Sequence, residues 1–264
     1  MKRVFLLAIL LLFTSSGSLL IAQRRSSVNA PNRNVPFDKS ITKLPIGFTG
    51  IDGDFLFREL EKRKKSLVKL EFETTAQFAA RVQHIENSPI TPFLNKDSLM
   101  AFVVAPSGFS SSYDADRSIL VFSILLSGAC SRFPLTEKIV VSKYKSQNAF
   151  GAEREVTKYE GTTLSIGWGY DQKLKTTPFL GGKELIGLTA KLEPSVAAVL
   201  KPKLRVLVIG KLKKRMIDQC REVVAPTFQV PKELDLTHQL ISFVVDEIWL
   251  FDPASGTVYD RIVE

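Results

Sequence analysis

The stretch LISFVVDEIWLF (residues 240–251), followed by DPASG (252–256) and TVYDRI (257–262), decides the fold class. A long apolar run of β-branched and aromatic residues predicts a buried strand. Proline and glycine in the pentapeptide predict a tight turn, after which the chain returns. The sequence therefore predicts a β-hairpin at this end of the chain.

Similar runs precede this hairpin at residues 99–104, 119–126 and 204–209, and each predicts a further strand. Residues 138–145, 153–159, 162–167 and 184–191 are also candidate strands, and several alternate polar and apolar positions. Such alternation indicates antiparallel sheet with one face in solvent. No fixed-period repeat occurs, so residues 51–264 are expected to form a single β-rich domain.

Three short helices are expected, mainly near the N-terminus. Asp52 can cap a helix that ends in the cations of residues 62–65. Thr74 and Gln77 have capping-box spacing for a helix over residues 75–87, whose apolar residues should lie on a core. Glu193 precedes Pro194 at the start of a third helix ending near residue 200. The expected class is α+β with a predominantly antiparallel sheet.

The first 22 residues have the layout of a signal peptide. Lys2 and Arg3 precede an apolar run over residues 4–13, small polar residues follow, and a second apolar patch ends at Ala22. Cleavage is expected after Ala22, with Ser18 as an alternative site and an uncleaved anchor as an alternative fate. Residues 23–50 are rich in Pro, Asn, Ser and Arg and are expected to be a flexible lead-in. The protein should be exported, to a periplasmic or extracellular location.

The chain is basic, with a formal net charge of +9 at pH 7. Two of these charges lie in the expected leader, so +7 remains after cleavage. A basic exported protein favours anionic lipid, wall polymer or acidic proteins as partners. The candidate anion-binding residues are Lys211, Lys213, Lys214 and Arg215, with a solvated face as the alternative. Aromatic residues are not interleaved with them, so nucleic acid is not expected, and membrane contact would be peripheral.

Cys130 and Cys220 are the only cysteines, and in an oxidising compartment they can form a disulfide. Two separate thiols are the alternative, because the sequence does not give their distance. The two histidines are too few for a histidine-rich metal site, and His84 is expected to meet carbonyls at a helix end. No metal, cofactor or catalytic residue is assigned, because no nucleophile elbow, zinc motif or phosphate-binding loop occurs.

Two phrases resemble segments of a group of uncharacterised exported bacterial proteins. KLEFETTAQFAARV (69–82) is similar to a phrase near the start of that group, and YKSQNAFGA (144–152) is similar to a strand and turn within it. Ser146 stands where the group often has glycine, so the local backbone can differ. The C-terminal pattern from residue 226 also looks like that group. No activity is established for the group, so the resemblance implies export and transfers no catalytic residue.

Gln147, Asn148 and Phe150 form the candidate ligand or partner turn, because loops on rigid sheets commonly carry binding groups. The expected function is non-catalytic binding of an envelope component, a protein partner or an anionic surface. An exported hydrolase that cleaves wall or carbohydrate polymers with two carboxyl groups is one alternative. A membrane-tethered assembly factor is the other.

Overall fold

The computed structural model describes residues 34–126, 130, 132–168, 172, 174–179 and 183–264. The expected leader, residues 1–22, lies outside these residues, as do residues 23–33 of the expected lead-in. All the described elements belong to residues 31–264, one of two units into which the chain divides.

The α+β class predicted from the sequence is confirmed. The helices are α1 (Gly53–Ser66), α2 (Thr75–Asn87), α3 (Pro194–Leu200) and the short 3-10 helix η1 (Pro106–Gly108). The strands are β1 (Met100–Val103), β2 (Ser110–Asp114), β3 (Ile119–Leu126), β4 (Arg132–Gln147), β5 (Glu153–Gly167), β6 (Thr177–Phe179), β7 (Lys183–Lys191), β8 (Arg205–Val224), β9 (Lys232–Phe251) and β10 (Val258–Val263).

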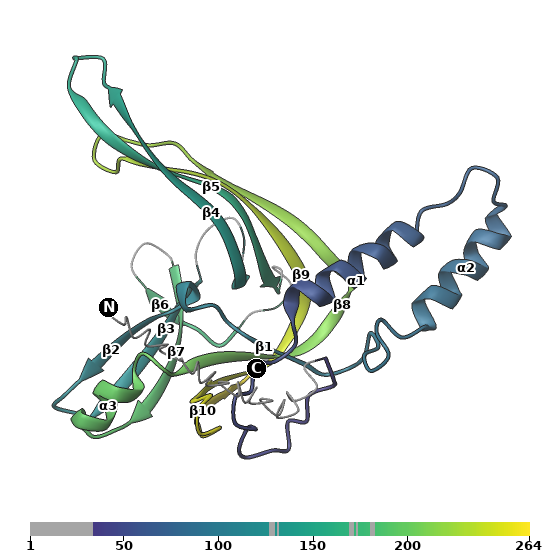
Figure 1. The fold of residues 1–264 in the computed structure, drawn as a ribbon, viewed down its shortest axis with the longest axis horizontal. Coiled ribbons are helices and arrows are strands. Elements are labelled where there is room, and N and C mark those ends of the chain that lie inside the picture. The colour runs from purple at the N-terminus through teal and green to yellow at the C-terminus, as the bar shows by residue number, and fades with distance from the viewer. Residues whose placement is uncertain (1–33, 127–129, 131, 169–171, 173, 180–182) are drawn as a thin grey trace, which may run out of the picture. The chain divides into compact units, whose positions relative to one another are not determined.

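Two sheets organise these strands (Figure 1). The larger has the order β1-β8-β9-β5-β4, with β10 beside one half of β9, and the smaller has the order β2-β3-β7-β6. Among the described strand pairs, β5 and β9 run parallel and the others run antiparallel. Asp260 on β10 accepts a hydrogen bond from the Thr189 amide on β7, so a polar contact links the two sheets.

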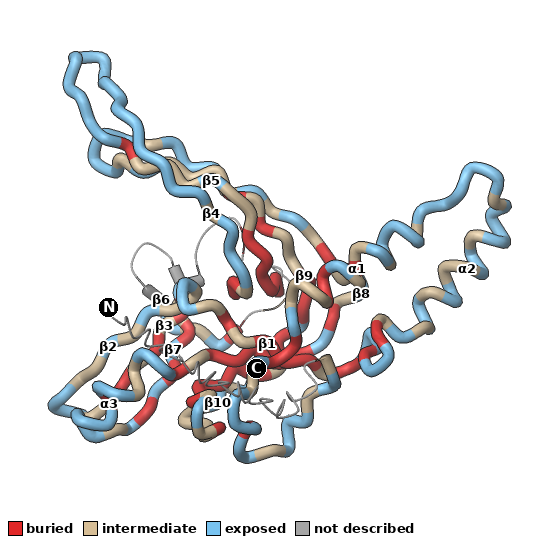
Figure 2. The backbone as a smooth tube through the Cα atoms, viewed as in Figure 1, coloured by how far each residue is buried: buried red, intermediate tan, exposed pale blue. Residues whose placement is uncertain are grey.

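The apolar pattern of β8 and β9 reflects burial on two faces. Val206 and Val208 lie in the main core, whereas Leu207 and Ile209 lie in a second cluster with Trp249. A strand buried on both faces has no polar alternation, which is why the run at residues 240–251 is nearly continuous. Figure 2 shows that burial is concentrated here, whereas the outer ends of the strands are exposed.

A large bulge interrupts β8. Leu212 is opposite Phe243 and Ile217 is opposite Ile241, so residues 213–216 of β8 face the single residue Ser242 of β9. Extra residues in one strand bend it and change which face its side chains occupy. The bulge thereby keeps both Leu212 and Ile217 in the core, although their spacing is odd.

Residues 34–50 pack on the second cluster, in contrast to the flexible lead-in expected from their composition. Phe37 stacks edge-on to Trp249, with ring centroids 5.4 Å apart, and Leu44 is only 2% exposed. The Leu44 amide donates to the carbonyl of Gly256, whose φ of +74° suits glycine in the final hairpin turn. Apolar side chains spaced among polar residues therefore anchor this segment without any regular period.

The two N-terminal helices differ in what they bury. Asp52 caps α1 as predicted, and Leu56, Phe57 and Leu60 pack into the core. The capping box of α2 is present, but α2 has no buried residue. The prediction that α2 lays an apolar stripe on a core is therefore wrong, because α2 extends beyond the sheets and its stripe is only partly covered.

Candidate functional site

The outer parts of two hairpins form a four-stranded extension with little core. We call this extension, residues 138–160 and 221–236, the β-arm. Its strands pair continuously in the order β8-β9-β5-β4. Within it, Val156 and Leu236 are buried. The exposed large apolar side chains of the β-arm are Val140, Val141, Tyr144, Phe150, Val223, Val224, Phe228 and Val230.

The β4–β5 turn carries the candidate residues Gln147, Asn148 and Phe150. The Asn148 side-chain oxygen accepts hydrogen bonds from the amides of Phe150 (3.0 Å) and Ala152 (2.9 Å), so Asn148 shapes the turn. Phe150 projects from this turn with 95% of its surface exposed. A large aromatic side chain held in water by a well-formed turn is available for contact with another molecule.

A hollow of about 180 Å³ lies between this turn and the loop that joins β8 to β9. Gln147 and Asn148 line it, but Phe150 does not. From the β8–β9 loop, the Phe228 ring centroid lies 4.7 Å from the guanidinium of Arg154 on β5, and Arg154 donates to the Phe228 carbonyl. The structure therefore brings two of the three candidate residues together with Phe228, and the two hairpin ends form one surface.

Exposed polar pairs replace a core along the β-arm. The Tyr144 hydroxyl donates to Glu233 at 2.6 Å, and Arg221 pairs with Asp235 at 3.0 Å. The hydrogen bond from Arg221 lowers the pKa of Asp235, and the one to Glu233 raises the pKa of Tyr144. Exposed pairs of this kind stabilise a fold weakly, so the β-arm depends mainly on its backbone hydrogen bonds.

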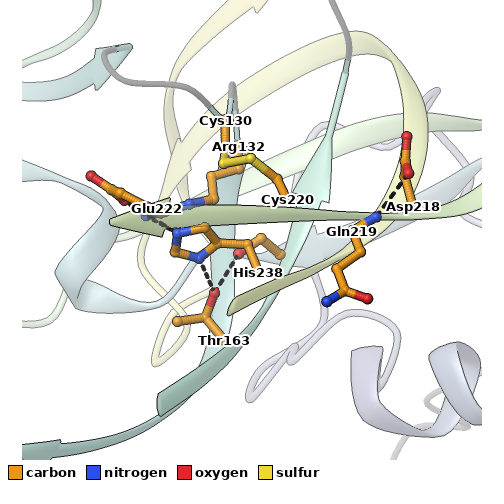
Figure 3. The surroundings of a disulfide bond; sticks show 9 residues. Cys130, Arg132, Thr163, Asp218, Gln219, Cys220, Glu222 and His238 are labelled. Atoms are coloured by element: carbon orange, nitrogen blue, oxygen red, sulfur yellow. Dashed lines mark hydrogen bonds and ion pairs between the residues drawn. A yellow bond between two sulfur atoms is a disulfide. The ribbon is translucent and has the colours of Figure 1, made fainter. Parts of the chain in front are cut away.

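A disulfide joins Cys130, just before β4, to Cys220 on β8, with the Cα atoms 6.1 Å apart (Figure 3). Beside it, the fully buried ring of His238 on β9 contacts two neighbouring strands. His238 Nδ1 lies 2.8 Å from the Thr163 hydroxyl, and Nε2 lies 3.2 Å from a Glu222 carboxylate oxygen. A covalent bond and a polar cluster thus lie together on one face of the larger sheet.

The polar cluster resembles a hydroxyl, histidine and acid triad, but its geometry indicates a structural role. Burial and the positive charge of Arg132 lower the pKa of His238, against the opposing effect of Glu222. The neutral imidazole is therefore favoured. Thr163 is 1% exposed and His238 is 0% exposed, so a substrate has no access to the hydroxyl. Arg132 also donates to Glu222 at 3.2 Å, which holds the acid in place.

The β8 bulge places part of the candidate anion-binding cluster beside the helices. Lys213 and Lys214 line a hollow of about 460 Å³, together with Arg63, Lys96 and the acidic residues Glu86 and Asp97. Lys211 and Arg215 do not line it. Arg215 instead pairs with Asp218 at 2.9 Å. Four basic and two acidic side chains therefore line this hollow, and the two acidic side chains weaken its attraction for anions.

No helix among the described residues is long and apolar enough to span a membrane. Nor do the described residues include a group of three or more His, Cys, Asp and Glu side chains that could hold a metal ion.

The carboxyl groups of Asp38, Glu73 and Asp235 have lowered pKa values, caused mainly by hydrogen bonds from Ser40, Arg81 and Arg221 respectively. A general acid in glycoside hydrolysis needs a raised pKa instead.

No pattern in the sequence marks Phe228, Arg154 or the polar cluster of His238, Thr163 and Glu222 as candidate site residues. Phe228 lies in the segment PTFQVP (226–231), where an aromatic residue among turn-forming residues is a signal of exposure. This polar cluster joins residues from three strands, β5, β8 and β9, and no local sequence pattern indicates such contacts. The chain matches no protein-family model, and no curated protein or solved structure shows significant similarity to it.

Proposed function

We propose that this protein is an exported, non-catalytic binding protein of the cell envelope, and that it holds a protein partner through the end of the β-arm. The observation that carries this proposal is the pair of exposed phenylalanines, Phe150 and Phe228, on adjacent hairpin ends. Aromatic side chains beside an arginine are the typical centres of protein interfaces. Here Arg154 stacks on Phe228.

The edges of the β-arm give additional support. The outer part of β4 has a strand partner on the β5 side and none on the other side among the described residues. An unpaired edge can accept an extended segment of another chain through backbone hydrogen bonds. The lysines at residues 138, 143 and 145 discourage unspecific pairing, so a specific partner would need matching side chains.

Export is supported by the leader-like residues 1–22 and by the disulfide. Disulfides persist mainly in oxidising compartments, such as the periplasm and the extracellular space. A bond between Cys130 and Cys220 is therefore consistent with the proposed location.

Site-specific photo-cross-linking in the native host tests the proposal. A photoreactive phenylalanine analogue at position 150 or 228 should give one discrete adduct with a protein. The same analogue at Val199, which is 55% exposed on α3, should not give that adduct. Phe150→Asp should reduce the adduct formed at position 228 by roughly tenfold or more, as expected for loss of an interface anchor. Equal adducts at positions 199 and 150, or none at 150 and 228, would overturn the proposal.

A further inference from the structure

The turn that joins α1 to α2, residues 67–74, carries three exposed apolar side chains. We call this turn the helical tip. Val68 and Leu70 are each 64% exposed, and Phe72 is 93% exposed. The two helices and this turn extend away from the sheets (Figure 1), and the turn is exposed throughout most of its length (Figure 2). None of these three side chains belongs to a core cluster of the described residues.

The helical tip is held in one conformation by Arg81 on α2. Arg81 donates to the carbonyls of Ser66 and Val68, at the end of α1. It also makes two hydrogen bonds to the Glu73 carboxylate, at 2.8 and 2.6 Å. Arg63 on α1 binds the carbonyls at the end of α2 in the same way. A rigid tip loses little conformational entropy when it binds another surface.

Exposed basic side chains lie close to the apolar side chains of the helical tip in the sequence. Lys64 and Lys65 are exposed in the last turn of α1, and Lys69 is exposed within the helical tip. The acidic residues of the tip are Glu71, which is exposed, and Glu73, which is paired with Arg81. The segment around Leu70 and Phe72 therefore combines exposed apolar side chains with three exposed lysines and one exposed acid, so its exposed charge is positive on balance.

We propose that the helical tip inserts into the surface of an anionic lipid bilayer. Leu70 and Phe72 would enter the boundary between headgroups and acyl chains, and the lysines would meet the phosphates. These lysines favour a bilayer over a protein groove, because lysine is depleted in protein interfaces but attracted to anionic lipid. This inference does not depend on the β-arm binding a partner, since the two surfaces share no residue.

A tryptophan placed at position 72 of the full chain reports insertion locally. With vesicles of equal parts phosphatidylglycerol and phosphatidylcholine, the emission of Phe72→Trp should shift to the blue and be quenched by lipids brominated high in the acyl chain. The native Trp168 and Trp249 are buried and provide a constant background. The matched control is Val199→Trp, which should show neither change. Because the probe is local, an effect of residues 1–22 on vesicle binding does not alter its interpretation.

Two sets of variants test the chemistry within the Phe72→Trp chain. Leu70→Asp should reduce the fraction of protein bound to vesicles, measured from the blue shift of the tryptophan emission, by roughly tenfold, because an apolar contact with the lipid is lost. Lys64→Gln and Lys65→Gln should each weaken binding by about fivefold at low salt. Val140→Asp on the β-arm is the matched control and should bind unchanged. An unshifted tryptophan with anionic vesicles, full binding by Leu70→Asp, or a blue shift that follows protein concentration without lipid would each overturn the proposal.

Discussion

His238 illustrates how a single polar side chain can be accommodated inside a sheet. Its ring has no exposed surface, yet Thr163 and Glu222 satisfy both nitrogens. Burial and Arg132 lower its pKa, so the neutral ring is the form that the fold stabilises. A buried imidazole of this kind positions strands relative to one another, because its two hydrogen bonds reach β5 and β8 at once.

This burial predicts an acid-sensitive fold. The unfolded chain has the ordinary histidine pKa near 6.5, and the folded pKa is lower. The stabilising contribution is therefore complete above pH 6.5 and decreases as the pH falls below it. Urea unfolding at about pH 7.5 and pH 5.5 should show a falling free energy of unfolding for the wild type and a smaller fall for His238→Gln.

The matched control is His84→Gln, because His84 is exposed on α2. The free energy of unfolding of the His84→Gln variant should fall between pH 7.5 and pH 5.5 by as much as that of the wild type. If the free energy of unfolding of His238→Gln fell as far as that of the wild type between these pH values, the lowered pKa of His238 would not be the cause of the acid sensitivity.

At the scale of elements, α2 is a helix whose stability comes from its ends. It buries no side chain, and its N-terminus is closed by the Thr74–Gln77 capping box. The carbonyls at its other end accept hydrogen bonds from Arg63. A short helix without a buried face depends on such caps, because helix propensity alone is marginal at this length.

Thr74→Ala should therefore loosen α2 without unfolding the sheets. Loss of an N-cap costs about 1 kcal/mol, which corresponds to roughly fivefold less protection of α2 amides from hydrogen exchange. The urea midpoint of the whole protein should stay unchanged, because the core does not include α2. Gln83→Ala is the control, since Gln83 is exposed in the same helix but caps nothing. A large shift of the urea midpoint for Thr74→Ala would contradict this account.

Local patterns predicted many elements because local physical chemistry forms them. The third helix begins at Pro194, the final turn ends at Gly256, and Asp52 caps α1, all as predicted. The lengths of β8 and β9 were not predictable, since their outer parts are polar and are paired by distant strands. The bulge at residues 213–216 was not predictable either, because most of it belongs to a run of basic residues in the sequence.

The candidate site was predictable only where one turn formed it. The phrase around Asn148 indicated a turn between two strands, and the structure contains it. The neighbouring position of Phe228 depends on the parallel pairing of β5 with β9, which no local signal gives. Exposure of Leu70 and Phe72 was equally hidden, because both residues precede a helix whose apolar residues were expected to lie on a core.

At the scale of the whole molecule, the disulfide connects parts of the chain that are 90 residues apart. It joins the start of β4 to β8, on either side of β9 and β5 in the larger sheet. Cross-linking a long loop stabilises a fold chiefly by restricting the unfolded chain. The bond therefore supports the sheet from which the β-arm extends.

The double variant Cys130→Ser/Cys220→Ser should unfold at lower urea concentration, with a loss of roughly 2–4 kcal/mol in the free energy of unfolding. Wild-type protein in excess reductant should match the variant, and the variant itself should not respond to reductant. Equal stability of the variant and the oxidised wild type would show that the cross-link does not stabilise the fold.

The disulfide also limits how far the chain can be extended by force. Cys130 and Cys220 enclose β4 to β7, α3 and most of β8 in one covalent loop. A force that separates the two termini passes through the sulfur atoms and bypasses this loop. About 300 Å of contour length, or 90 residues at roughly 3.5 Å each, thus stays inaccessible to stretching while the bond is intact. When the two termini of an oxidised molecule are pulled apart, the covalent chain of the β4–β5 half of the β-arm would therefore not lie in the path of the force.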